Sequence, residues 1–173
     1  MPDQKAPGSL PHGIVASSVT PFDDDGRVAL DRVHLHIDWL IEQGVDGIVV
    51  SNHGGKALDR APASIEVLPG IKAAVGDRLA VMLDSGVRRG SDIIIARCLG
   101  ADFVFVGRAT LYGVAAAGLA GATRALDILR EEIDINLGLI GCPRFADLGP
   151  DFLLRDGGET SSPDSVPAIA ETV

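Results

Sequence analysis

Short apolar runs alternate along the chain with longer segments whose apolar residues recur at helical spacing. The run at residues 48–50 is too short for a helix and is β-branched, which is typical of a buried parallel strand. The four runs are residues 13–19, 48–50, 79–83 and 103–106. The helical segments that follow them are residues 30–41, 62–75, 93–99 and 109–139. This alternation predicts an α/β fold with a parallel sheet.

Two of these helices carry residues that favour an interruption. Pro69 has no backbone N–H and predicts a break inside the second helix. The glycines of the long fourth helix are candidate break points, and Leu126, Leu129 and Ile133 are expected to share one face of it.

Polar, glycine-rich turns follow three of the predicted strands. The first is Ser51-Asn52-His53-Gly54-Gly55, the second runs from Asp84 to Gly90, and the third is Gly107-Arg108. Ligands of α/β proteins bind at this end of the strands, and an imidazole such as that of His53 can move protons near neutral pH. The alternative is that the two glycines only make a tight turn and His53 is an ordinary surface residue; the turn by itself favours that alternative.

Two of the turns together suggest a phosphate site. Ser85-Gly86 precedes a predicted helix whose first N–H groups are unpaired, and Gly107 lets the backbone approach a ligand closely. Arg88 and Arg108 can add planar, bidentate contacts. The alternative is that these arginines pair with the acidic residues nearby, which are Asp84, Asp92 and Asp102.

Composition narrows the class of protein. The 173 residues are one domain's worth of chain, and 46% hydrophobic but only 4% aromatic residues favour an α/β protein over a sandwich. The net charge of −9 argues against a nucleic-acid partner. Cys98 and Cys142, with no secretory leader, predict reduced thiols in the cytoplasm. No membrane span is expected, and no metal site, because His34 and His36 face different ways.

Residues 45–153 closely resemble the C-terminal part of the FMN-dependent α-hydroxy-acid dehydrogenases and oxidases. The motifs that carry the resemblance are SNHGG at 51–55, PASIEVLP at 62–69, DSGVRRG at 84–90, GADFVFVGR at 100–108, ALDILREEID at 125–134 and GCP at 141–143. The resemblance implies part of a (β/α)₈ barrel, FMN as cofactor, and oxidation of a 2-hydroxy acid of the lactate, glycolate or mandelate type to the 2-oxo acid.

The same resemblance assigns roles to residues of the turns. His53 is implied as the base that takes a proton from the substrate. The positions implied for the flavin phosphate and ribityl chain are Ser51, Asp84, Gly86, Arg88, Gly107 and Arg108. Lys56 stands where the family has an arginine that clamps the substrate carboxylate. Lysine is a point charge on a flexible stem and cannot reproduce the bidentate fork, so we expect feeble catalysis.

The beginning of the chain resembles a different family. Residues 13–50, with VTPF at 19–22 and HIDWLIEQGVDG at 36–47, are similar to the opening of the dihydrodipicolinate synthases and N-acetylneuraminate lyases. We therefore expect an aldolase-like first unit at 13–46, joined to a dehydrogenase-like part at 47–153. Residues 1–12 are expected to form a flexible arm and residues 154–173 a disordered tail. Schiff-base lyase activity is the weaker expectation, because no lysine matches that family's motif.

Four βα units predict about half of a barrel, and two copies are expected to associate because four strands cannot close one. The alternatives to an enzyme are a half-barrel that only holds FMN or another phosphate, and a scaffold without a ligand.

Overall fold

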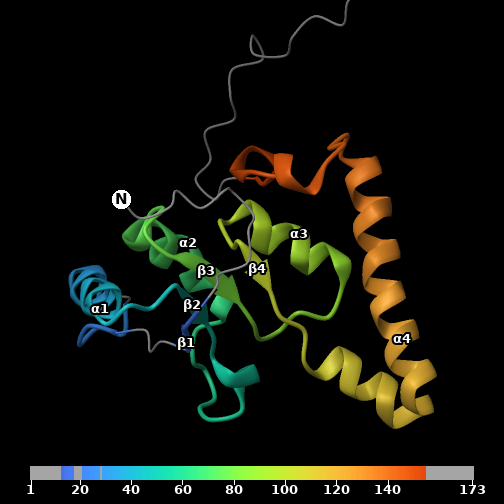
Figure 1. Ribbon diagram of the computed structural model, residues 1–173, viewed down its shortest axis with the longest axis horizontal. Helices are drawn as coiled ribbons and strands as arrows, with labels where there is room; N and C mark the ends of the chain where they lie inside the picture. Colours follow the sequence, from blue (N-terminus) through green and yellow to red (C-terminus); the bar gives the residue numbers. More distant parts are fainter. Residues whose placement is uncertain (1–12, 18–20, 28, 155–173) are drawn as a thin grey trace, which may run out of the picture.

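The computed structural model describes residues 13–17, 21–27 and 29–154. A parallel sheet in the order β1-β2-β3-β4 forms its centre (Figure 1). The strands are β1 Val15–Ser17, β2 Gly47–Val50, β3 Ala80–Leu83 and β4 Phe103–Val104. All three pairings are parallel, so the carboxyl ends of the strands lie along one edge of the sheet.

Each strand is followed by a helix, which confirms the predicted α/β alternation. The helices are α1 Leu30–Glu42, α2 Ser64–Val75, α3 Gly90–Cys98 and α4 Arg108–Leu139. Short 3₁₀ turns are η1 His53–Gly55, η2 Phe145–Asp147 and η3 Pro150–Phe152. The predicted arm at 1–12, the end of the first strand at 18–19 and the tail from 155 onward lie outside the described residues.

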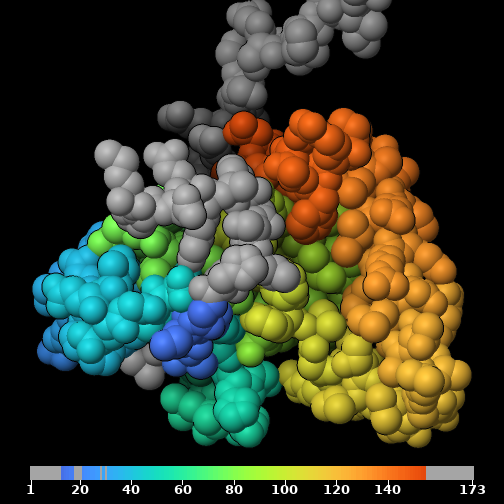
Figure 2. Space-filling view, viewed as in Figure 1, coloured from blue at the N-terminus to red at the C-terminus, as the bar shows by residue number. Residues whose placement is uncertain are grey.

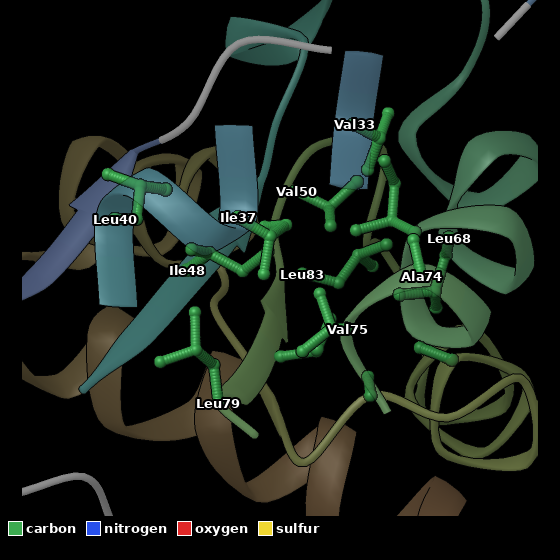
Figure 3. Close-up of a cluster of buried hydrophobic side chains, with 14 of the residues drawn as sticks. Val33, Ile37, Leu40, Ile48, Val50, Leu68, Ala74, Val75, Leu79 and Leu83 are labelled. Carbon is green, nitrogen blue, oxygen red and sulfur yellow. The ribbon is translucent and has the colours of Figure 1, made fainter. Parts of the chain in front are cut away.

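The main core lies between the sheet and helices α1 and α2 (Figure 3). Strand residues alternate between the two faces of a sheet, so Ile48 and Val50 point toward these helices while Val49 points to the other face. Ile48 and Val50 pack in one cluster with Ile37 of α1 and Leu68 of α2. Each fully buried side chain of this kind contributes about 1.5–3 kcal/mol.

Helix α2 is continuous through Pro69, so the predicted break is wrong. It starts at Ser64 rather than residue 62, where the Glu66 side chain accepts a hydrogen bond of 3.1 Å from the Ala63 N–H. Proline costs one helical hydrogen bond, but its fixed φ is helical, and Leu68 and Ile71 on either side of it are buried. Their burial outweighs the lost bond.

Helix α4 bends at Ala117 and Gly118, which confirms that a glycine interrupts it. Gly118 has φ 57°, a value that suits glycine. The expected common face is only partly correct, because Leu129 is buried whereas Leu126 is 39% exposed. β4 ends at Val104, two residues earlier than predicted. None of the helices in the described ranges has the length and apolar character of a membrane span.

Gly90 lets α3 and α4 pack closely. A Cβ at Gly90 would lie 2.6 Å from the Glu132 Cβ and 2.6 Å from the Ile133 nitrogen. The Glu132 carboxylate accepts hydrogen bonds from the Gly90 N–H, at 2.7 Å, and from Arg89 Nη2, at 2.8 Å. These two donors, the Gly90 N–H first, hold the pKa of Glu132 below its ordinary value.

Both cysteines are free and buried. Cys98 of α3 and Cys142 belong to a second, small apolar cluster with Ile94 and Leu148. Burial, and then the neighbouring Cys142, raise the pKa of Cys98.

Candidate functional site

The turns after β2, β3 and β4 surround one cavity of about 910 Å³. In Figure 2 the surface is hollowed between the cyan-green turn after β2 and the yellow start of α4. The bend at Gly118 brings the second half of α4 back to the same cavity. The lining residues are His53, Gly54, Lys56, Asp84–Arg88, Phe105–Ala109, Leu111, Tyr112, Ala125, Ile128 and Leu129.

The turn after β2 is left-handed over three successive residues: His53, Gly54 and Gly55 have φ of 57°, 71° and 72°. This conformation is uncommon for histidine and is held by side-chain oxygens. The His53 N–H donates to Ser51 Oγ at 3.1 Å, and the Gly55 N–H donates to Asn52 Oδ1 at 3.0 Å. His53 is exposed to the cavity as a result.

The turn after β3 supports the turn after β2. Ser85 has φ 74°, and its hydroxyl donates to Asp84 Oδ1 at 2.7 Å. The same hydroxyl accepts a hydrogen bond of 2.9 Å from the Gly54 N–H. Gly86 follows with φ 78° and open space where a Cβ would lie. The ends of β2 and β3 are therefore joined by a short polar chain.

The turn after β4 is also joined to Gly54. Arg108 Nη2 donates a hydrogen bond of 3.0 Å to the Gly54 carbonyl. Gly54 thus has its N–H bound to the β3 turn and its carbonyl bound to the start of α4. Since Gly107 also faces open space, a ligand can approach the backbone between the two turns.

The acidic neighbours do not neutralise the two arginines. Asp92 accepts from the backbone N–H groups of Arg88 and Arg89. Asp102 pairs with Lys72 and Arg97. Within the described ranges, the Arg88 guanidinium has no hydrogen-bond or ion-pair partner, and it lines the cavity. The alternative in which these aspartates pair with Arg88 or Arg108 is therefore not what the structure contains.

The structure brings seven of the eight candidate site residues to the cavity: His53, Lys56, Asp84, Gly86, Arg88, Gly107 and Arg108. Ser51 does not line it, and its hydroxyl supports the His53 backbone instead.

Several residues that line the cavity are not among the eight candidate site residues. Ser85 stands beside Gly86 in the turn predicted for the phosphate site, but its bond to the Gly54 N–H joins two turns and leaves no local signal. Tyr112 and Ile128 carry no motif, and Ile128 reaches the cavity only through the bend of α4.

FMN fits this cavity on its geometry. The volume lies within the range of about 300–1,000 Å³ that is usual for small-molecule sites. The same cavity is lined by Arg88, whose guanidinium is free, and by Gly86 and Gly107, for whose N–H groups the described residues offer no acceptor. Such a set of donors suits a phosphate group.

Comparison with known proteins places the chain in a family. The model of the FMN-dependent dehydrogenase family matches residues 36–155. The pre-mycofactocin synthase of Mycobacterium tuberculosis is 52% identical over 138 residues, which are 79% of this chain and 34% of that protein. The (S)-mandelate dehydrogenase of Pseudomonas putida is 47% identical over 126 residues, which are 73% of this chain and 32% of that protein.

A solved structure of an oxidised, active mutant of (S)-mandelate dehydrogenase superposes with a TM-score of 0.69 and 40% identity. The superposed part is 83% of this chain and 36% of the mandelate dehydrogenase chain. The chain therefore spans about a third of the length of the curated relatives named above.

These comparisons confirm the resemblance, the partial (β/α)₈ barrel and FMN as the cofactor of the matched family. The match begins nine residues before Val45, inside α1. The aldolase-like character of residues 13–46 stays a prediction. The family model covers well over half of the chain, and the chain belongs to the FMN-dependent dehydrogenase family.

Proposed function

We propose that this chain binds FMN in the cavity and oxidises a 2-hydroxy acid to the corresponding 2-oxo acid. The observation that carries the proposal is that Gly54 links the turn bearing His53 to the turns bearing Arg88 and Arg108. A base and a set of phosphate donors therefore face one cavity. Relatives named as (S)-mandelate dehydrogenase and L-lactate oxidase support a 2-hydroxy acid as the substrate class.

The cofactor would be held at its phosphate by Arg88, Arg108 and the N–H groups of Gly86 and Gly107. The Asp84 carboxylate lines the same cavity and can accept hydrogen bonds from hydroxyls of the ribityl chain. Bound flavin supplies an acceptor for the two electrons that the substrate loses.

The substrate is handled by His53 and Lys56, which line the cavity on the turn after β2. The imidazole of His53 takes the proton that leaves the hydroxyl or the α-carbon, since imidazoles exchange protons near neutral pH. The Lys56 ammonium attracts the substrate carboxylate but does not fix its orientation. Weak orientation predicts slow turnover, because positioning contributes several kcal/mol to such reactions.

We also propose that two copies of the chain associate. Within the described residues, β1 and β4 are the two edges of the sheet. Val15 of β1 is 38% exposed and Phe103 of β4 is 40% exposed. Open edges pair readily with other strands, and two four-stranded halves supply the roughly eight strands of a closed barrel. Light scattering after size exclusion tests this, because a stable monomer at micromolar concentration would contradict it.

The proposed function is tested by loading the chain with FMN and adding 2-hydroxy acids without oxygen. We expect L-lactate, glycolate or (S)-mandelate to bleach the flavin absorbance. His53→Asn should keep FMN bound and slow bleaching by roughly 10²–10⁴-fold, the usual contribution of a general base. Bound flavin that none of these acids bleaches would favour the alternative of a half-barrel that only holds FMN. A chain that binds no flavin would contradict both.

A further inference from the structure

We propose that Ser85 is a positioning residue for His53, acting through the peptide that joins His53 to Gly54. The inference rests on the proposed role of His53 as the base. Ser85, in the turn after β3, would fix the orientation of the His53 imidazole in the turn after β2.

The direction of the Cα–Cβ bond of His53 is set by the two peptide planes that flank its Cα. The His53 N–H, in the first plane, donates to Ser51 Oγ at 3.1 Å. The Gly54 N–H, in the second plane, donates to Ser85 Oγ at 2.9 Å. A hydroxyl therefore holds each plane. Ser51 lies in the same turn as His53, whereas Ser85 comes from the neighbouring strand and anchors the turn to the sheet.

The Ser85 hydroxyl is oriented for this task. It donates its proton to Asp84 Oδ1 at 2.7 Å, which leaves a lone pair for the Gly54 N–H. A hydroxyl that donates to a carboxylate is a stronger acceptor, because hydrogen bonds in a chain polarise one another. The Gly54 carbonyl is held at 3.0 Å by Arg108, so the turn cannot rotate away without losing a second bond.

The backbone at Ser85 also points to a use for the hydroxyl. Its φ of 74° is costly for any residue with a Cβ and cheap for glycine. Nothing in the turn conformation itself favours serine over glycine. The Ser85 side chain therefore occupies a strained position, and its hydroxyl makes hydrogen bonds to Asp84 and to the turn that carries His53.

Two substitutions separate positioning from simple stabilisation. Ser85→Ala removes the hydroxyl and keeps the strain of a Cβ, whereas Ser85→Gly removes the hydroxyl and relieves the strain. The glycine variant should be the more stable of the two by thermal unfolding. If Ser85 only stabilises the fold, the glycine variant should keep the His53 order parameter and the flavin reduction rate of the wild type. If Ser85 positions His53, both quantities should fall to a similar extent in the two variants.

The primary readout is NMR of the FMN-loaded protein. In both variants we expect the Gly54 amide to exchange at least about tenfold faster, since it loses its acceptor. The order parameter of the His53 Cα–Hα bond should fall from about 0.85 to below about 0.6. His34 and His36 on α1 are controls within the same sample and should not change.

The second readout is anaerobic flavin reduction by a saturating 2-hydroxy acid. We expect both variants to lose roughly 10- to 100-fold in rate with FMN affinity changed less than about twofold, because a small displacement of a catalytic group is costly. An unchanged His53 order parameter in both variants would overturn the proposal. A lower order parameter and a lower reduction rate in the alanine variant alone would overturn it as well. Wild-type flavin that no hydroxy acid reduces would contradict the proposed function, and the NMR comparison would still decide the role of Ser85.

Discussion

Arg108 at the start of α4 donates a hydrogen bond of 3.0 Å to the carbonyl of Gly54, a residue 54 positions earlier in the chain. The bond joins the ends of β2 and β4, although β3 lies between them in the sheet. Ser85 from the end of β3 holds the N–H of the same glycine. The three turns therefore form one connected site rather than three separate loops.

Arg108→Ala should weaken FMN binding by about 1.5–3 kcal/mol, the range for a hydrogen bond to a charged group. This corresponds to a dissociation constant raised roughly 10- to 150-fold. Quenching of flavin fluorescence on titration measures it. Arg130→Ala is the control, because Arg130 is exposed on α4 and does not line the cavity. Equal affinities of the two variants would rule out Arg108 as a phosphate ligand.

Lys56→Arg should speed the reduction of bound flavin by a 2-hydroxy acid, because a guanidinium grips a carboxylate with two parallel hydrogen bonds. Lys56→Gln, which removes the charge at similar length, should slow it. Anaerobic bleaching rates of the three proteins give the order. A slower arginine variant would show that Lys56 does not handle the carboxylate.

Much of this site could be predicted from local sequence. The strand ends at Val50 and Leu83 and the glycines that follow them are encoded within a few residues, so the positions of His53 and Arg88 at one edge of the sheet were predictable. The role of Gly54 was not, because its partners, Ser85 and Arg108, come from other turns. Contacts of this kind depend on how the turns are placed in three dimensions.

The predictions about the fold that were wrong also failed because they rested on local sequence alone. Pro69 predicts a break on local grounds, yet burial of Leu68 and Ile71 keeps α2 whole. Ile128 carries no motif, and the bend at Gly118 brings its half of α4 back to the cavity. Ser51, expected near the cofactor, does not line the cavity, and its hydroxyl accepts a hydrogen bond from the His53 N–H instead.

Gly90→Ala should destabilise the protein by about 1–3 kcal/mol, the usual cost of overpacking. The added methyl would lie 2.6 Å from the Glu132 Cβ and force α3 away from α4. Gly138→Ala is the matched control, since Gly138 lies in α4 with open space around it. That change should be neutral or stabilise the helix by up to about 1 kcal/mol. Urea unfolding would show both effects, and similar midpoints for the two variants would contradict the close packing.

The Glu132 carboxylate should make stability depend on pH at the acidic end. Its folded-state pKa is lowered by the Gly90 N–H and then by Arg89, so its contribution is complete above the ordinary value of 4.5. The contribution is lost as the pH falls through the lowered folded value. Wild type should therefore exceed Glu132→Gln in unfolding free energy at pH 6, and the gap should narrow toward pH 3. A gap that is constant across this range would contradict the assignment.

The claim that the ends of β2, β3 and β4 form one FMN site is tested most directly by comparing the affinities of this chain for FMN and for riboflavin. The two flavins differ only in the phosphate, for which we propose Arg88, Arg108 and the N–H groups of Gly86 and Gly107 as ligands. Two or more charged hydrogen bonds predict FMN binding at least about 100-fold tighter than riboflavin, measured by fluorescence titration at one salt concentration. Equal affinities, or no binding of either flavin, would contradict the site.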